Sequence, residues 1–167
     1  HQQVGGDYYD FIWLNENEFV FCVADVSGKG VAAALLMSNF QANLRVLLDH
    51  TDSLTELVKE LNSKVMSSAK GEKFITLFIA KYNVITHTLT YINAAHNPPL
   101  LASHNSVSTL KIGCTGLGMF DEIVKIKEGI VNITPGTTIV CYTDGLVELE
   151  NDKGDEFGMD ALKQIIK

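Results

Sequence analysis

Hydrophobic residues recur along the chain with two different spacings, and the changes of spacing divide it into predicted elements. Apolar residues alternate with others from Gly5 to Leu14 and again from Phe19 to Val26, and the stretch between them, 15–18, is poor in strand formers. This pattern predicts a β-hairpin. From Gly30 to Asp49 the spacing becomes helical, so a long helix is predicted directly after the second strand.

The rest of the chain continues with one helix and then several strands. Ser53 followed by Glu56 forms a capping box and predicts the start of a second helix. Beyond Gly71 the alternation returns and predicts a second hairpin, several short strands and a last amphipathic segment, over residues 74–84, 88–96, 100–103, 106–112, 124–133, 137–143 and 159–167. Runs of strands separated from runs of helices predict an α+β fold with antiparallel sheets.

Length, charge and cysteine content narrow the class of protein. The 167 residues suit one domain, 1–167, and because patterned sequence begins at once we expect the chain to be truncated at both ends. No apolar run approaches the ~18 to 20 residues that span a bilayer, so direct membrane insertion is not expected. The net charge of −7 argues against nucleic acid as a partner. Three cysteines, an odd number, are predicted to be buried reduced thiols of a cytoplasmic protein.

Three aspartates occupy equivalent positions at predicted strand ends. Asp7 follows a pair of glycines, Asp25 ends a strand before a Ser-Gly-Lys-Gly turn, and Asp144 ends another strand before a glycine. One interpretation is ordinary turn formation, since Asp before Gly often starts a turn. The other is a metal site, because Mg²⁺ and Mn²⁺ prefer carboxylate oxygens and rigid strand ends can hold two such ions. The recurrence at three places favours the metal site.

Three further residues each allow two interpretations. His96 could serve as a general acid, since its charge changes near neutral pH, or as a hydrogen-bonded structural residue. Lys29 could bind an anionic substrate or simply be solvated. Asp10 lies three positions after Asp7, so on a regular strand its side chain points to the opposite face. It could at most contact the metal ligands and would not bind the metal itself.

The segments together closely resemble the PPM family of metal-dependent serine/threonine protein phosphatases (protein phosphatase 2C-like). They are most similar to its bacterial branch of sporulation stage II phosphatase E and sigma-regulating phosphatases. The resemblance runs in order along nearly the whole chain. It is carried by GGDYYDF, VADVSGKGVAAALLMS, the ELN of the second helix, FITLFIAKYN, YINAAHNPPLL, GLGMF, YTDGLVELEN and EFG.

The resemblance implies two packed antiparallel sheets flanked by helices, with two Mn²⁺ or Mg²⁺ ions at one end of the sandwich. It implies that Asp25 bridges the ions, that the Val26 carbonyl helps to hold one, and that Asp7 and Asp144 complete the metal shells. A metal-activated water then hydrolyses phosphoserine or phosphothreonine on a protein. The implied substrate is a phosphorylated anti-sigma-factor antagonist, and the implied partner in regulation is an upstream sensor or regulatory domain.

Three departures from the family pattern accompany the resemblance. Ser27 stands where the eukaryotic branch has a histidine, and Ala95 stands where the family usually reads glycine (NAGH). A further aspartate that the family carries near its C-terminus is not among these residues. A catalytically impaired pseudophosphatase that acts as a regulatory binding module is therefore the alternative function, and an unrelated metal-dependent hydrolase is a third.

Overall fold

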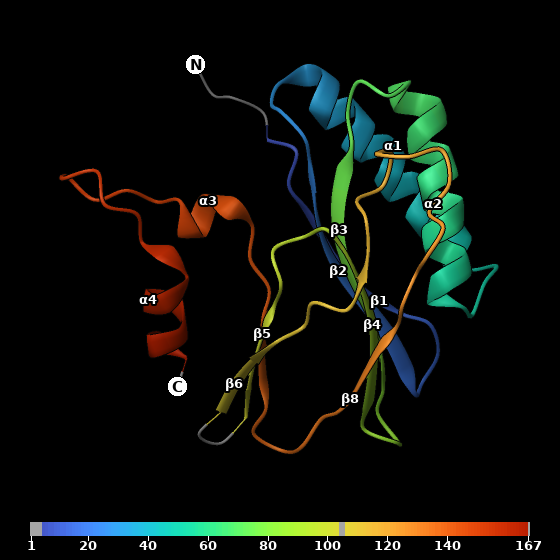
Figure 1. The fold of residues 1–167 in the computed structure, drawn as a ribbon. Coiled ribbons are helices and arrows are strands. Elements are labelled where there is room, and N and C mark those ends of the chain that lie inside the picture. Colours follow the sequence, from blue (N-terminus) through green and yellow to red (C-terminus); the bar gives the residue numbers. More distant parts are fainter. Residues whose placement is uncertain (1–4, 104–105, 167) are drawn as a thin grey trace.

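The computed structural model describes residues 5–103 and 106–166, which form four layers. Two helices pack on one face of a six-stranded sheet, a three-stranded sheet lies on its other face, and two shorter helices lie beyond the second sheet (Figure 1). Three apolar clusters fill the spaces between these layers. This arrangement confirms the predicted α+β fold of two packed sheets flanked by helices.

A β-hairpin begins the larger sheet, as the alternating pattern predicts. Strands β1 (Tyr8–Trp13) and β2 (Glu18–Val26) pair antiparallel with Tyr8 opposite Ala24. Asp7 and Asp25 are the next residues outward in this register. Both aspartates therefore lie at the same end of the hairpin.

The two sheets differ in size. The larger has the order β1-β2-β3-β4-β7, with β8 also paired to β4, and the smaller has the order β6-β5-β9. The remaining strands are β3 (Ile75–Asn83), β4 (Thr88–Ala94), β5 (Leu100–Ser103), β6 (Ser106–Thr109), β7 (Gly113–Cys114), β8 (Gly129–Asn132) and β9 (Thr138–Val140).

Two long helices cover the outer face of the larger sheet. Helix α1 (Val31–Leu48) begins directly after the turn that follows Asp25, and this turn needs Gly28 and Gly30, whose φ angles are 83° and 92°. Helix α2 (Leu54–Ala69) has the predicted cap, since the Ser53 side chain accepts a hydrogen bond from the Glu56 N–H.

The composition of α1 corrects one expectation. Across residues 5–103 and 106–166 it is the single helix whose length and mean hydropathy (18 residues, 1.3) would suffice to cross a membrane, although no such apolar run was expected. Its buried side chains pack on the sheet and on α2, as core helices do: Ala33, Leu36, Met37, Phe40, Leu44 and Leu48.

Aromatic residues line the face of the hairpin that is turned away from α1 and α2. Phe11 pairs with Phe21 and Trp13 with Phe19 across β1 and β2, and the Phe11 and Phe19 ring centroids are 4.5 Å apart. Toward β3 these rings become part of the apolar layer between the sheets, where Phe21 contacts the fully buried Phe78. The opposite face of the same strands packs against α1 and α2.

The second sheet is covered on its outer side by short helices. Helix α3 (Asp144–Val147) follows β9 closely, and α4 (Gly158–Ile165) supplies the buried Leu162. Leu162 packs against Leu100 and Tyr142, which close the third apolar cluster.

The structure departs from the predicted elements in two places. The predicted strand 124–133 shortens to β8, and Val124, which is 96% exposed, lies in a segment without strand pairing. Strands β4 and β7 pair in parallel, with Asn93 opposite Gly113, so the larger sheet is not wholly antiparallel. In both places tertiary pairing, which local alternation does not encode, decides the outcome.

Candidate active site

Three predicted site residues come together at one end of the larger sheet. Asp7 precedes β1 and Asp25 lies next to the last residue of β2. Asp144 was predicted to end a strand, but β9 stops at Val140, so Asp144 instead begins α3. The Thr143 hydroxyl donates a 2.9 Å hydrogen bond to the Asp7 carboxylate, which ties the segment before α3 to the start of β1. The fold thus joins residues that lie 136 positions apart in the chain.

Gly6 permits the close approach of these segments. A Cβ atom at Gly6 would lie 3.1 Å from the Val26 carbonyl oxygen, 3.2 Å from a carboxylate oxygen of Asp25 and 3.0 Å from the Val26 Cβ. These separations are tighter than ordinary contacts, so a side chain there would press β1 away from β2. The carbonyl of Val26 and the carboxylate of Asp25 therefore face the same narrow space beside Gly6.

The three carboxyl groups influence one another electrostatically. Burial, hydrogen bonding with Asp7 and the negative charges of Asp7 and Asp144 together raise the pKa of Asp25 to about 6. Across residues 5–103 and 106–166, no three His, Cys, Asp or Glu side chains are gathered tightly enough to form a ready-made metal site. The acids are thus close enough to interact, but they do not form a compact three-ligand cluster.

Two cavities adjoin the carboxyl groups, and Asp25, Gly28 and Asp144 line both of them. One cavity, of about 330 Å³, extends toward Phe74 and His96. The other, of about 400 Å³, contains Gly6, Asp7, Val26 and Lys29. A water occupies ~30 Å³ in the liquid, so each space admits a small polar group together with several waters.

Three residues support the site, and two of them, Thr143 and Lys73, were not identified from the sequence. Thr143 holds Asp7, as described above. Ser27 accepts a 2.9 Å hydrogen bond from the Phe74 N–H through its hydroxyl and donates its own N–H to the Phe74 carbonyl at 2.9 Å. Lys73 donates to the Ser27 carbonyl at 3.2 Å, which places an ammonium group beside the turn that follows Asp25. The one signal that the sequence gives for these three residues is that they lie in or beside a motif. Their hydrogen-bond partners are distant in the chain and are set by the tertiary fold.

His96 has the buried, hydrogen-bonded environment that the structural interpretation predicts. It is 5% exposed, and its ring nitrogens contact the Thr76 hydroxyl at 2.9 Å and the Tyr142 carbonyl at 3.2 Å. Burial lowers its pKa, although the Tyr142 carbonyl and the charges of Asp144 and Asp7 oppose that shift. Lys29 is exposed on the wall of the second cavity.

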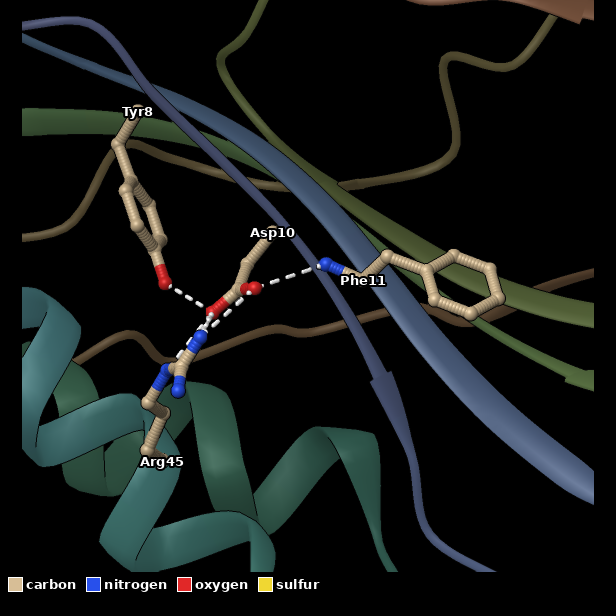
Figure 2. A network of polar contacts seen from close by, with 4 residues as sticks. All are labelled: Tyr8, Asp10, Phe11 and Arg45. Atoms are coloured by element: carbon tan, nitrogen blue, oxygen red, sulfur yellow. Dashed lines mark hydrogen bonds and ion pairs between the residues drawn. The ribbon is translucent and has the colours of Figure 1, made fainter.

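Asp10 lies on the opposite face of β1 from the aromatic residues, and it points toward α1 (Figure 2). Its carboxylate accepts hydrogen bonds from the Tyr8 hydroxyl, the Phe11 N–H and the Arg45 guanidinium. Asp10 therefore links the hairpin to the helix layer and does not line either cavity beside the acids.

The departure from the family's glycine at Ala95 has a structural consequence. Ala95 adopts φ 55°, in the left-handed region where a Cβ is unfavourable and glycine is normally preferred. Its N–H donates to the Cys114 carbonyl at 3.2 Å, and the residue lines the first cavity directly before His96. The local backbone that presents His96 is therefore strained in this chain.

Comparison with known proteins identifies the family of this chain. The family described as stage II sporulation protein E (SpoIIE) matches residues 15–167. The chain belongs to the SpoIIE family. This confirms the resemblance drawn from the sequence motifs.

A curated relative supports the same assignment, and two solved structures share the fold. The phosphoserine phosphatase RsbU of Bacillus subtilis is 30% identical over 154 residues, which are 92% of this chain and 46% of RsbU. The SiaA-PP2C domain of Pseudomonas aeruginosa has a TM-score of 0.83 at 20% identity, covering 97% of this chain and 65% of that one. The structure of RsbX in complex with magnesium has a TM-score of 0.68 at 20% identity, and the match covers 86% of this chain and 72% of RsbX. The chain thus spans about half the length of RsbU.

Proposed function

We propose that this chain is the catalytic domain of a metal-dependent protein phosphatase that hydrolyses phosphoserine or phosphothreonine. The observation that carries the proposal is the meeting of Asp7, Asp25 and Asp144 from three distant segments, where burial, a hydrogen bond with Asp7 and the charges of the other two acids raise the pKa of Asp25 to about 6. An isolated turn aspartate would not need two acidic neighbours. The name of the relative RsbU, a phosphoserine phosphatase, supports the substrate class.

The chemistry of the site fits hard divalent cations, Mn²⁺ or Mg²⁺. Asp25, Asp7, Asp144 and the Val26 carbonyl would hold two ions, and all four offer the oxygen ligands that such cations prefer. The space beside Gly6, which a Cβ would fill, leaves the Val26 carbonyl and Asp25 accessible from one side. The magnesium complex of RsbX, a protein of the same fold, supports a divalent ion. When bound, such ions polarise phosphoryl oxygens and lower the pKa of a coordinated water toward ~7.

The protein side chains then have separate tasks. Thr143 orients Asp7 by donating to its carboxylate, and the Gly145 N–H donates to Asp144 at 2.8 Å, so both carboxylates keep fixed directions. Lys29 and Lys73, near the turn after Asp25, supply positive charge that attracts a phosphorylated segment. Ser27 is engaged with Phe74 through both its hydroxyl and its N–H, so it holds the turn in place.

A phosphorylated anti-sigma-factor antagonist is the proposed substrate, and an upstream sensor or regulatory domain is the proposed regulator. Membership of the SpoIIE family, with RsbU among the relatives, supports a place in sigma-factor regulation. Helix α1 is suited to transmit regulation because it starts directly after the turn that follows Asp25 and leaves Val31 and Leu35 more than 60% exposed. The three cysteines, all free thiols, support a cytoplasmic location.

The deciding experiment measures phosphate release from a phosphoserine peptide by the intact protein with Mn²⁺ or with EDTA. We expect release that requires the metal and is abolished in Asp25→Ala, whereas Asp152→Asn, in an exposed loop away from the cavities, retains the wild-type rate. Undiminished release by Asp25→Ala would contradict the proposal. Binding of the phosphopeptide without release would instead favour the pseudophosphatase.

A further inference from the structure

We propose that His96 is a positioning residue that holds Asp144 and Asp25 in register, with its ring protonated on Nε2. The inference deepens the proposed function, and its metal-binding part rests on that function. His96 lies two residues after β4, and its buried ring bridges β3, which pairs with the strand of Asp25, and the segment directly before Asp144. Its ring nitrogens are bonded to Thr76 and to the Tyr142 carbonyl and not to either carboxylate, so it would act through the backbone that carries them.

The hydrogen-bond partners assign the tautomer. The Tyr142 carbonyl can only accept a hydrogen bond, so the Nε2 atom 3.2 Å away must carry the hydrogen. The ring is buried, which favours the neutral form, and in a neutral ring Nδ1 is then the acceptor. The Thr76 hydroxyl, 2.9 Å from Nδ1, therefore donates to the ring, which is nearer to it than its other acceptor, the Asp25 carbonyl at 3.5 Å.

Each partner is directly connected to one acid. Tyr142 lies two residues before Asp144, and Thr143, between them, holds Asp7. Thr76 lies on β3 opposite Asp25 of β2 in the strand register. A shift of the ring would therefore move the backbone of Tyr142 relative to β3, and with it the direction in which Asp144 faces Asp25.

Few other contacts fix the segment that begins at Asp144. Helix α3 has four residues, none of them buried, and its internal bonds run from the Leu146 N–H to the Thr143 carbonyl and from the Glu148 N–H to the Asp144 carbonyl. Tyr142 itself is anchored by its hydroxyl, which donates to the Pro98 carbonyl at 3.2 Å. Within the described residues, the bond from His96 is therefore the one hydrogen bond that a side chain makes to the main chain of Tyr142.

The same contacts argue against His96 as a general acid. Both ring nitrogens have hydrogen-bond partners in the protein. The main-chain N–H of His96 donates to the Asn93 side chain at 2.8 Å, which fixes the backbone that carries the ring. The Nε2 hydrogen is directed at the Tyr142 carbonyl, so it is not available to a leaving group in the cavity. His96 lines that cavity as part of its wall.

Two substitutions separate the two ends of the ring. In His96→Asn the side-chain amide ends near the position of Nδ1. This variant therefore keeps the contact with the Thr76 hydroxyl and loses the hydrogen bond to the Tyr142 carbonyl. In His96→Gln the amide reaches the position of Nε2 and can still donate to the Tyr142 carbonyl. The stability control is Leu57→Ala, a core truncation in the first turn of α2. The segment before this helix is bonded through the Asp52 carbonyl to Lys81, at the far end of β3 from Thr76.

The first measurement is hydrogen exchange of the intact protein in EDTA, read at residues 143–148. We expect exchange at least tenfold faster in His96→Asn than in wild type, and within about threefold of wild type in His96→Gln and Leu57→Ala. The inference is overturned if these residues exchange at the same rate in His96→Asn and in wild type. It is also overturned if His96→Gln loses as much protection from exchange as His96→Asn. If neither variant folds, ring ¹⁵N resonances of the wild-type protein decide: a hydrogen on Nδ1 in place of Nε2 overturns it.

The second measurement is Mn²⁺ affinity of the same proteins, which depends on the proposed function. Loss of a residue that orients a ligand typically weakens metal binding 10- to 100-fold, so we expect at least a tenfold loss in His96→Asn and little change in Leu57→Ala. Unchanged affinity in His96→Asn overturns the inference even where Asp25→Ala abolishes phosphate release. If the wild-type protein neither binds Mn²⁺ nor releases phosphate, the proposed function fails, while hydrogen exchange still decides the positioning role.

Discussion

Arg45 on α1 holds the carboxylate of Asp10 on β1 through two nitrogens, with Nε 2.9 Å from one oxygen and Nη2 3.0 Å from the other (Figure 2). Burial opposes ionisation of Asp10, but hydrogen bonds from Tyr8 and Arg45 outweigh it and keep its pKa below the ordinary value. This forked contact is a polar link between the first strand and the helix that follows the turn after Asp25, beside the edge-on packing of Tyr8 against Phe40.

The first prediction is that the stabilisation by Asp10 depends on pH. A lowered pKa in the folded state means that the ionised carboxyl stabilises the fold above its ordinary pKa of ~3.9 and loses this effect as the pH falls through the lower folded value. Asp10→Asn should therefore lower the melting temperature at pH 7, and the difference from wild type should shrink below pH 4. Thermal unfolding from pH 2.5 to 7 measures this, and a difference that is constant with pH would contradict it.

The second prediction concerns Asp25, whose folded pKa of about 6 lies above its ordinary value of 3.8. A raised pKa contributes stability that is fully present below the ordinary value and is lost as the pH rises through about 6. In EDTA the wild-type protein should therefore melt at a lower temperature at pH 7.5 than at pH 5. Asp25→Asn should show a smaller decline and a higher melting temperature at pH 7.5, although it removes a proposed metal ligand. The same decline in Asp25→Asn and in the control Asp152→Asn would refute this.

The third prediction follows from the left-handed backbone at Ala95. Glycine avoids the steric cost of this conformation, which is ~1 to 2 kcal/mol, but it loses more entropy on folding. Ala95→Gly should therefore raise the free energy of unfolding by about 0.5 to 1 kcal/mol, measured by urea denaturation. The control is Ala94→Gly, in a buried residue of β4 with ordinary φ, which should destabilise the protein. A loss of stability in Ala95→Gly would show that the methyl group makes a favourable contact.

The fourth prediction concerns Asn62, a buried side chain on α2 that holds the loop around Gly118. Its amide donates to the carbonyls of Phe120 and Asp121 at 3.0 and 3.2 Å and accepts from the Gly118 N–H at 2.8 Å. Asn62→Leu would leave these groups without partners, so we expect a loss of about 2 to 4 kcal/mol in the free energy of unfolding. Asn39→Leu, on the exposed side of α1, should change stability by less than about 0.5 kcal/mol. Similar losses in both variants would mean that the hydrogen bonds of Asn62 contribute little.

The sequence was most informative where a local pattern and its tertiary partner agree. The capping box at Ser53 and the hairpin that carries Asp7 and Asp25 could be predicted because short-range spacing encodes them. The segment around Val124 alternates like a strand but has no pairing partner, so alternation alone misled the prediction there.

The residues that hold the site in place could not be predicted from sequence spacing. The partners of His96 are Thr76 and Tyr142, which lie 20 and 46 residues away, and no spacing rule connects them. The strain at Ala95 was visible only as a departure from the family's glycine, and its cause became clear from the backbone angle. Side chains that act by holding others are specified by the packed fold as a whole.

The bond between Thr143 and Asp7 also has a consequence for folding, because it joins residues 136 positions apart. Contacts with so large a sequence separation close long loops and tend to form late. The hairpin that carries Asp7 and Asp25 can pair early, but Asp144 can join these acids only after the long segment between them has been synthesised. An incompletely folded chain would lack the third acid, so the appearance of catalytic competence would mark the end of folding.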